Sequence, residues 1–165
     1  MHYLCNGQMM TIFKTVFFLL LLTVVILFAT LYRNDANLFQ EPGVAQRLNI
    51  FLTTNSAKIE DDHILPELRT PVFQQDASRL FGRIVHEATE MGWTVSSTDR
   101  ENQQANFTVS SPMFLFKDDV FVQVKFEGMK RSSVYMESRS RTGNADLAAN
   151  SSHIQSMLRR LRTSQ

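Results

Sequence analysis

The residues best suited to chemistry lie in two polar segments in the C-terminal half of the chain. One segment carries two adjacent aspartates. The other, between residues 138 and 150, carries two arginines spaced two residues apart, then a glycine, an aspartate and an asparagine. Carboxylates can act as acids or bases, and a guanidinium can hold a phosphate or carboxylate through two parallel hydrogen bonds. The candidate polar cluster comprises Asp118, Asp119, Arg139, Arg141, Asp146 and Asn150.

Two antiparallel strands should position most of this cluster. Apolar residues at even positions define one strand from residue 120 and another from residue 134, joined by a short turn near residues 128–131. Successive side chains of a strand point to opposite faces. Asp119 should therefore lie on the face opposite the apolar residues, directly across from Arg139 or Arg141 depending on the register. We predict an ion pair between Asp119 and one of these arginines.

The surroundings of the two aspartates decide what the cluster could do. An exposed ion pair contributes about 0–1 kcal/mol, whereas removing one partner of a buried pair costs about 3–5 kcal/mol. Asp118 has the other parity and should face Ser138 and Ser140. Its carboxylate could accept hydrogen bonds from their hydroxyls. Adjacent strand residues point apart, so the two carboxylates cannot easily share a substrate. We therefore predict no catalytic residue.

The arginines leave two interpretations open. They either hold a small anionic ligand, or they are neutralised by Asp119 and Glu137. The sequence also contains none of the nucleophile elbow, phosphate-binding loop or zinc-protease motifs. With a single cysteine, Cys5, it cannot build a thiolate zinc site. We expect no metal and no cofactor.

The remaining patterns predict an α+β fold. Asp76 is a candidate N-cap for a helix that ends at Gly92. A last helix has its apolar stripe at Ile154, Met157, Leu158 and Leu161, and alternating residues between the helices predict strands near Trp93, Ala105, Val120 and Val134. We expect an antiparallel sheet of about four strands with two helices packed on one face, leaving the other face polar.

The N-terminal region predicts a membrane anchor. The uncharged run of about 18 residues from Thr15 to Tyr32 would span about 27 Å as a helix, close to the ~30 Å hydrocarbon core. We expect a tail at residues 1–14, a transmembrane helix at 15–33, a linker at 34–66 and a domain at 67–165. A cleaved signal peptide is the competing interpretation, but no small-x-small cleavage site follows the run. The lipid bilayer is thus the expected partner of residues 15–33.

The charges that flank the apolar run do not determine the orientation of the helix in the membrane. Lys14 and Arg33 bracket the apolar run almost symmetrically, so the short tail before it is what favours an extracytoplasmic, periplasmic domain on a single-pass inner-membrane protein. Translation could begin at Met1, Met9 or Met10. The net charge of +1 gives no basic face for nucleic acid.

Several short motifs together resemble the domain-of-unknown-function 1499 family. They are the Phe114–Val120 segment containing Lys-Asp-Asp-Val, the Ser138–Asn150 segment containing Ser-Arg-Thr-Gly, Met91-Gly92-Trp93 and His63–Leu68, over roughly residues 64–161. Among the possible caps of the last helix, Asn144, Asp146 and Asn150, the resemblance implies that Asn150 is structural at the helix start while Asp146 bonds within the loop. Gly143 should supply a backbone angle that other residues resist.

Two residues depart from the family pattern, and the family itself implies no activity. Ala148 stands where a glycine is expected, and His153 stands where a permanently basic residue is expected. We therefore predict a membrane-anchored extracytoplasmic domain that acts as a non-catalytic binding or interaction module of the cell envelope. Its partner would be an envelope protein or a small anionic ligand. The alternative is an envelope enzyme acting on an anionic or lipid-like substrate through Asp118, Asp119, Arg139 and Arg141.

Overall fold

The computed structural model of the chain describes residues 2–110 and 116–163, with side chains from residue 8 onward. Met1, and Phe114 and Leu115 of the family-like motif, lie outside the described residues. The helices are α1 (His2–Arg33), α2 (Val44–Thr53), α3 (Ala77–Glu90) and α4 (Ala149–Thr163), with a short 3-10 helix η1 (Pro66–Leu68). The strands are β1 (Ser56–Lys58), β2 (Val72–Phe73), β3 (Thr94–Asp99), β4 (Gln104–Ser110), β5 (Lys117–Gly128) and β6 (Arg131–Ser140).

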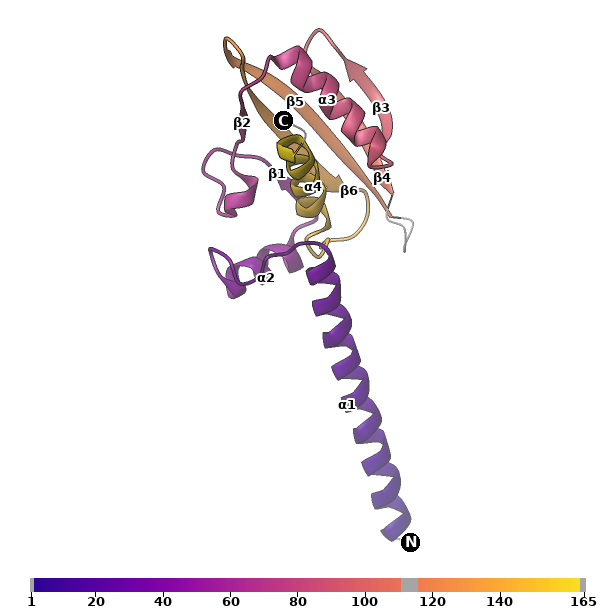
Figure 1. Ribbon diagram of the computed structural model, residues 1–165. Coiled ribbons are helices and arrows are strands. Elements are labelled where there is room, and N and C mark those ends of the chain that lie inside the picture. The colour runs from indigo at the N-terminus through magenta and orange to yellow at the C-terminus, as the bar shows by residue number, and fades with distance from the viewer. Residues whose placement is uncertain (1, 111–115, 164–165) are drawn as a thin grey trace.

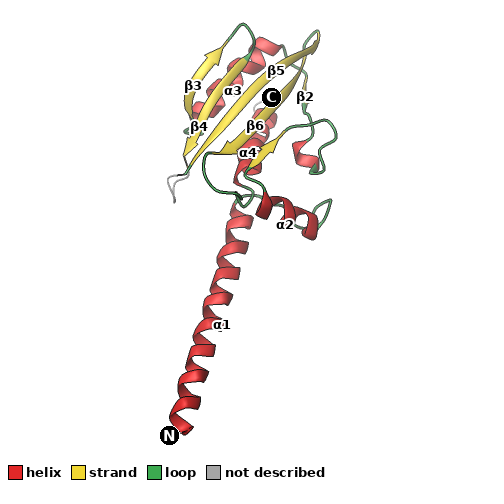
Figure 2. Cartoon of the chain, turned by 180° about the vertical axis from the view of Figure 1, so that it is seen from behind, coloured by secondary structure: helices red, strands yellow, loops and turns green. Residues whose placement is uncertain are grey.

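The strands form one antiparallel sheet, so the predicted α+β class is confirmed. Its order is β1-β6-β5-β4-β3, and β2 also pairs with β6. Helices α3 and α4 lie together against one face (Figure 1), and the view from behind shows the other face without a covering helix (Figure 2).

The expected number of elements is wrong in two respects. The sheet has six strands rather than four, because β1 and β2 add to the edge of β6. Strands of three and two residues are too short to show an alternating pattern in the sequence. The described chain also has four α-helices rather than an anchor and two packed helices, because α2 was not anticipated.

The hydrophobic pattern sets the register of the central hairpin. Val122 pairs with Met136 and Val124 with Val134, and all four are buried under the helices. A shift by one residue would turn every one of these side chains to the open face. The predicted face assignment of β5 and β6 is confirmed, and it places Asp119 on the open face.

The predicted capping of α3 is also confirmed. The Asp76 side chain accepts hydrogen bonds from the backbone N–H of Ser78 at 3.0 Å and of Arg79 at 3.3 Å. At the other end Gly92 has a φ of +77°, the left-handed conformation in which glycine often ends a helix.

Residues 34–66, expected to be a linker, are folded onto the domain. Phe51 of α2 and Ile59 after β1 are fully enclosed in the core. Arg47 of α2 is completely buried and is bound by both carboxylate oxygens of Glu67, at 2.6 and 2.9 Å. Its N–H groups also bind the backbone carbonyls of residues 36, 40 and 41. Sequence patterns predict an exposed position for an arginine, so the burial of Arg47 could not be predicted from the sequence.

Helix α1 extends away from the domain as a single rod (Figure 1). Its segment Gln8–Arg33 is long and apolar enough, by length and composition, to cross a membrane. The last turn meets the domain, because Leu31 is fully buried in the core cluster and Leu27 packs against that cluster.

Candidate functional site

Asp119 forms the predicted ion pair, and its partner is Arg141. The Arg141 Nε and Nη2 atoms lie 2.9 and 2.6 Å from the two carboxylate oxygens of Asp119. Arg139 is the residue directly across the ladder, so the pair is diagonal, a spacing that a long side chain can bridge. The pair is an exposed one, with side-chain exposures of 48% for Arg141 and 56% for Asp119. The Arg141 guanidinium is the main reason that the pKa of Asp119 lies below its usual value.

Arg139 remains more open than Arg141. Its side chain is 66% exposed, and its closest charged partner is Glu137, 3.7 Å away. Both arginines stand on the uncovered sheet face, and neither lines the hollow at Phe81 or the smaller one at Phe51. The arrangement favours the interpretation in which Asp119 and Glu137 neutralise these arginines.

Asp118 lies on the other side of the sheet, under α4. It is 5% exposed, it pairs with Ser140 in the ladder, and its Oδ2 is 2.9 Å from His153 Nε2. Burial opposes the ionisation of Asp118, but the hydrogen bonds from His153 and Ser140 outweigh it and hold the pKa below its usual value. The imidazole also meets the edge of Trp93 at a centroid distance of 6.0 Å. Sequence reasoning did not pair His153 with Asp118, because β5 and α4 are distant in the chain and meet only in the fold.

Asn150 is the hydrogen-bonding centre between β6 and α4. Its fully buried side chain accepts a hydrogen bond from the Ser138 hydroxyl at 2.6 Å. Its Nδ2 donates to the carbonyl of Asn55 and to the Ser140 oxygen, at 2.8 and 2.9 Å. A buried amide that satisfies three partners fixes the docking angle of a helix. Asn150 thus has the structural position implied by the family resemblance.

Asp146 organises the loop before α4. Its two carboxylate oxygens accept the backbone N–H groups of Ala148 at 3.0 Å and of Asn150 at 2.9 Å. Burial raises the pKa of Asp146, although these hydrogen bonds partly oppose the rise. Gly143 has a φ of +89°, as expected, and Ala148 occupies the left-handed region with a φ of +70°. A glycine would suit position 148 for this reason.

The six residues of the cluster therefore separate into two groups on opposite faces of the sheet. Asp119, Arg139 and Arg141 belong to the open face, and Asp118, Asp146 and Asn150 belong to the joint under α4. Within the described residues no group of three or more His, Cys, Asp or Glu side chains is placed to hold a metal ion. A single ligand could not contact both groups at once.

The comparisons with known proteins identify the family of this fold. The model of a family described as "Protein of unknown function (DUF1499)" matches residues 40–161. The chain belongs to the DUF1499 family. The match begins just before α2, in the segment that the sequence suggested was a linker. No curated protein shows significant similarity to the chain.

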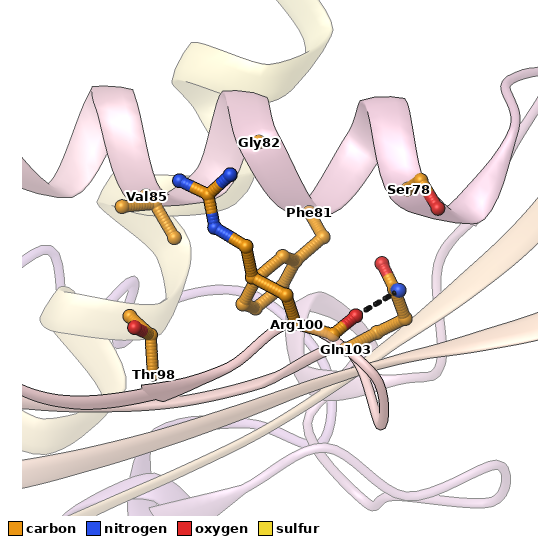
Figure 3. A pocket seen from close by; sticks show the side chains of 7 residues that line it. All are labelled: Ser78, Phe81, Gly82, Val85, Thr98, Arg100 and Gln103. Atoms are coloured by element: carbon orange, nitrogen blue, oxygen red, sulfur yellow. Dashed lines mark hydrogen bonds between the residues drawn. The ribbon is translucent and has the colours of Figure 1, made fainter.

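A different part of the DUF1499 domain carries a hollow of about 290 Å³. It lies between α3 and the turn that joins β3 to β4, at the end of the domain far from α1 (Figure 1). Phe81 and Val85 supply apolar surface, and Gly82 leaves open space where another residue would place a side chain. Hydroxyls of Ser78 and Thr98 stand at its margins (Figure 3).

Two polar groups of this hollow are uncommitted. The side chain of Arg100 reaches from the turn toward α3 (Figure 3), and it takes part in none of the ion pairs found among the described residues. The amide of Gln103 is held by a 2.6 Å hydrogen bond from its Nε2 to the Arg100 carbonyl. Its buried Oε1 has no hydrogen-bond partner in the described structure. A buried acceptor without a donor costs about 1–3 kcal/mol.

The turn that carries Arg100 is itself well braced. Asp99 accepts the backbone N–H groups of Glu101 and Asn102, at 3.0 and 3.1 Å, and the Asn102 amide at 2.7 Å. Sequence reasoning missed this region, because Asp99–Gln103 reads as an ordinary polar turn and nothing in it signals that Phe81 lies beneath.

Proposed function

We propose that this protein is a membrane-anchored, extracytoplasmic binding module of the cell envelope whose site is the hollow between α3 and the β3–β4 turn. The ligand would be small, with an anionic group and a short apolar part. The observation that carries the proposal is the contrast between arginines. Arg141 is bound by Asp119, whereas Arg100 overhangs an apolar hollow with no carboxylate partner among the described residues.

Anchoring by α1 is supported by its composition and by its place in the structure. The apolar segment Gln8–Arg33 projects from the domain with its side chains exposed along most of its length. A helix that is apolar all round needs a membrane or a protein core to cover it. In the proposed arrangement the first residues of α1, before the apolar run, remain in the cytoplasm, and the domain lies outside, in the periplasm.

The chemistry of the hollow supports the ligand class. Phe81 and Val85 would contact an alkyl or aryl part, and the Arg100 guanidinium would bind a carboxylate or phosphate through two donors. The unpartnered Gln103 Oε1 could accept a hydrogen bond from a hydroxyl of the ligand. A volume near 290 Å³ is at the lower end for ligand pockets and suits a molecule of few heavy atoms.

Binding can be tested with hexanoate as the probe and the full chain reconstituted in nanodiscs. Ligand-observed NMR should detect hexanoate binding, and Arg100→Ala should weaken it at least about tenfold. Hexylamine, of the same length and opposite charge, should not bind. Arg139→Ala is the matched control, because it removes another exposed arginine and should leave binding unchanged. Equal binding to wild type and Arg100→Ala would refute this site.

The proposed side of the membrane needs a separate test. Reporter fusions after Gln165 should show enzymatic activity with a periplasm-dependent reporter and no fluorescence with a cytoplasm-dependent one. The opposite pattern would reverse the orientation and leave the hexanoate result unaffected.

The alternative of an envelope enzyme has weaker support. The hydrogen bond between Asp118 and His153 resembles a pair used in acid–base catalysis, yet Asp118 is buried beneath α4 and Asp119 points to the opposite face. His153→Gln retains a side chain that can hydrogen-bond. An envelope reaction lost in this variant at unchanged stability would favour the enzyme over the binding module.

A further inference from the structure

We propose that α2 and the chain before it form a docking surface that rests in the interface of the lipid bilayer and fixes the orientation of the domain on the membrane. This juxtamembrane surface consists of Tyr32, Phe39, Val44, Leu48 and Leu52. The inference rests on the proposed anchoring by α1 and adds to it a second contact with the same membrane.

The first argument is that the domain sits directly on the end of α1. Leu31 is fully buried in the core cluster. The Asn34 amide donates to the carbonyl of Leu147 at 2.9 Å, and Asp35 pairs with Arg159 at 2.8 Å. No free linker separates the apolar helix from the domain. If α1 spans the bilayer, the base of the domain lies at the membrane surface.

The second argument is the position of α2. Both views place it at the end of α1, with its axis crossing that of α1 steeply (Figures 1 and 2). A helix that crosses the end of a transmembrane helix in this way lies along the plane of the membrane, at the level of the lipid headgroups.

The third argument is the exposed apolar stripe of α2. Val44, Leu48 and Leu52 are spaced by four residues, so they share one side of the helix. Val44 and Leu52 are 38% and 42% exposed, and Leu48 between them is partly buried and also packs against the core. The stripe borders Arg47 and Phe51, which are buried in the domain.

The chain on either side of the Arg33 end of α1 carries two further exposed aromatic rings. Phe39 is 93% exposed and Tyr32 is 88% exposed. Aromatic rings are favoured at the membrane interface, and clustered exposed apolar side chains mark an interaction surface.

The lack of exposed charge on α2 indicates that this surface is attracted to the lipid tails rather than to anionic headgroups. Arg47 is the one charged residue of α2, and it is turned into the domain toward Glu67. The polar residue Gln46 lies two positions from both Val44 and Leu48, on the side of α2 away from the stripe, and is exposed. The surface should therefore bind by apolar burial, as interfacial helices do, and a neutral phosphatidylcholine bilayer should suffice.

Single-cysteine labelling of the full chain in phosphatidylcholine vesicles tests this contact. With Cys5→Ser as background, a polarity-sensitive fluorophore is attached to Phe39→Cys, Leu52→Cys or Gln46→Cys, and a label at Val24→Cys reports insertion of α1. We expect a nitroxide on the upper acyl chain to quench the labels at 39 and 52 several-fold more than the label at 46. Aqueous iodide should show the reverse order.

The two proposals fail in different ways. If the label at 24 is shielded from iodide while those at 39 and 52 behave like the one at 46, the docking surface is refuted and the anchor stands. If iodide reaches the label at 24, the anchor is refuted, and the docking surface with it. An unchanged unfolding midpoint, followed by the fluorescence of Trp93, verifies that each labelled chain is folded.

Discussion

Arg47–Glu67 and Arg141–Asp119 are two arginine–carboxylate pairs, each made by two hydrogen bonds, and their surroundings are opposite. In each pair two nitrogens of the arginine approach both carboxylate oxygens, at distances of 2.6 and 2.9 Å: Nη1 and Nη2 of Arg47, and Nε and Nη2 of Arg141. The Arg47 side chain is 0% exposed and that of Glu67 is 15% exposed, against 48% and 56% for the other pair. Contact distances alone therefore say little about what each pair contributes.

The difference in burial assigns the two pairs different roles. Around Arg47 the guanidinium also satisfies backbone carbonyls of the segment that leads from α1 to α2, so the pair joins this segment to η1. On the open face water can replace either partner of the Arg141 pair at small cost. Burial makes the first pair part of the junction between the domain and α1, and exposure leaves the second as a surface feature.

The largest expected effect is that of Glu67→Gln. This change preserves the size of the side chain but leaves the Arg47 cation buried without a counter-charge, so the free energy of unfolding should fall by about 3–5 kcal/mol. Chemical denaturation of the full chain in detergent, followed through the single tryptophan Trp93, would measure it. A loss below about 1 kcal/mol would mean that the carbonyls alone accommodate the cation.

Asp118→Asn should change how stability depends on pH. The folded-state pKa of Asp118 is lowered, so its carboxylate adds stability that is complete above the unfolded value of about 3.9. That stability disappears as pH falls through the folded pKa. The stability difference between wild type and Asp118→Asn should therefore be largest near pH 7 and shrink on acidification, which unfolding curves at several pH values would show.

Asp146→Asn is the matched control for this pH dependence. Burial raises the pKa of Asp146, so the folded state binds more protons and wild type should gain stability over Asp146→Asn as pH falls. The same sign for both variants would contradict the assignment of their environments.

Ala148→Gly should stabilise the protein modestly. Ala148 has a φ of +70°, and relief of left-handed strain in a residue with a Cβ is worth about 1 kcal/mol. Loss of the buried methyl offsets part of that gain. Ala149→Gly is the control, because it lies within α4 and should destabilise by about 1 kcal/mol. A higher thermal midpoint for the first variant and a lower one for the second are expected.

The smallest expected effect is that of Asp119→Asn, the counterpart of Glu67→Gln on the open face. The thermal midpoint should change by no more than about 4 °C, and by less still in 1 M salt, where exposed charges are screened. A loss as large as that of Glu67→Gln would erase the distinction drawn between the two pairs.

Much of the fold and part of the cluster could be predicted from local patterns. The alternation around Val120 and Val134 determined which face Asp119 and Asp118 occupy, and Asp76 and Gly92 marked the ends of α3. The strands β1 and β2 could not be predicted, because three and two residues carry no periodicity. The alternation of side chains predicted that Asp119 pairs with Arg139 or Arg141. The choice of Arg141 depends on the path of the chain after Ser140, which the sequence did not reveal.

Features that depend on neighbouring residues follow from the sequence: an apolar α1, the α+β class, the parity of β5 and β6, and the cap at Asp76. Features that join residues far apart in the chain required the fold, such as Arg47 with Glu67, Asp118 with His153, and Arg100 above Phe81. The physical reason is burial. The residue type of a charged side chain does not show whether it is exposed to water or buried in the core. Its contribution to stability depends on the atoms that the fold packs around it.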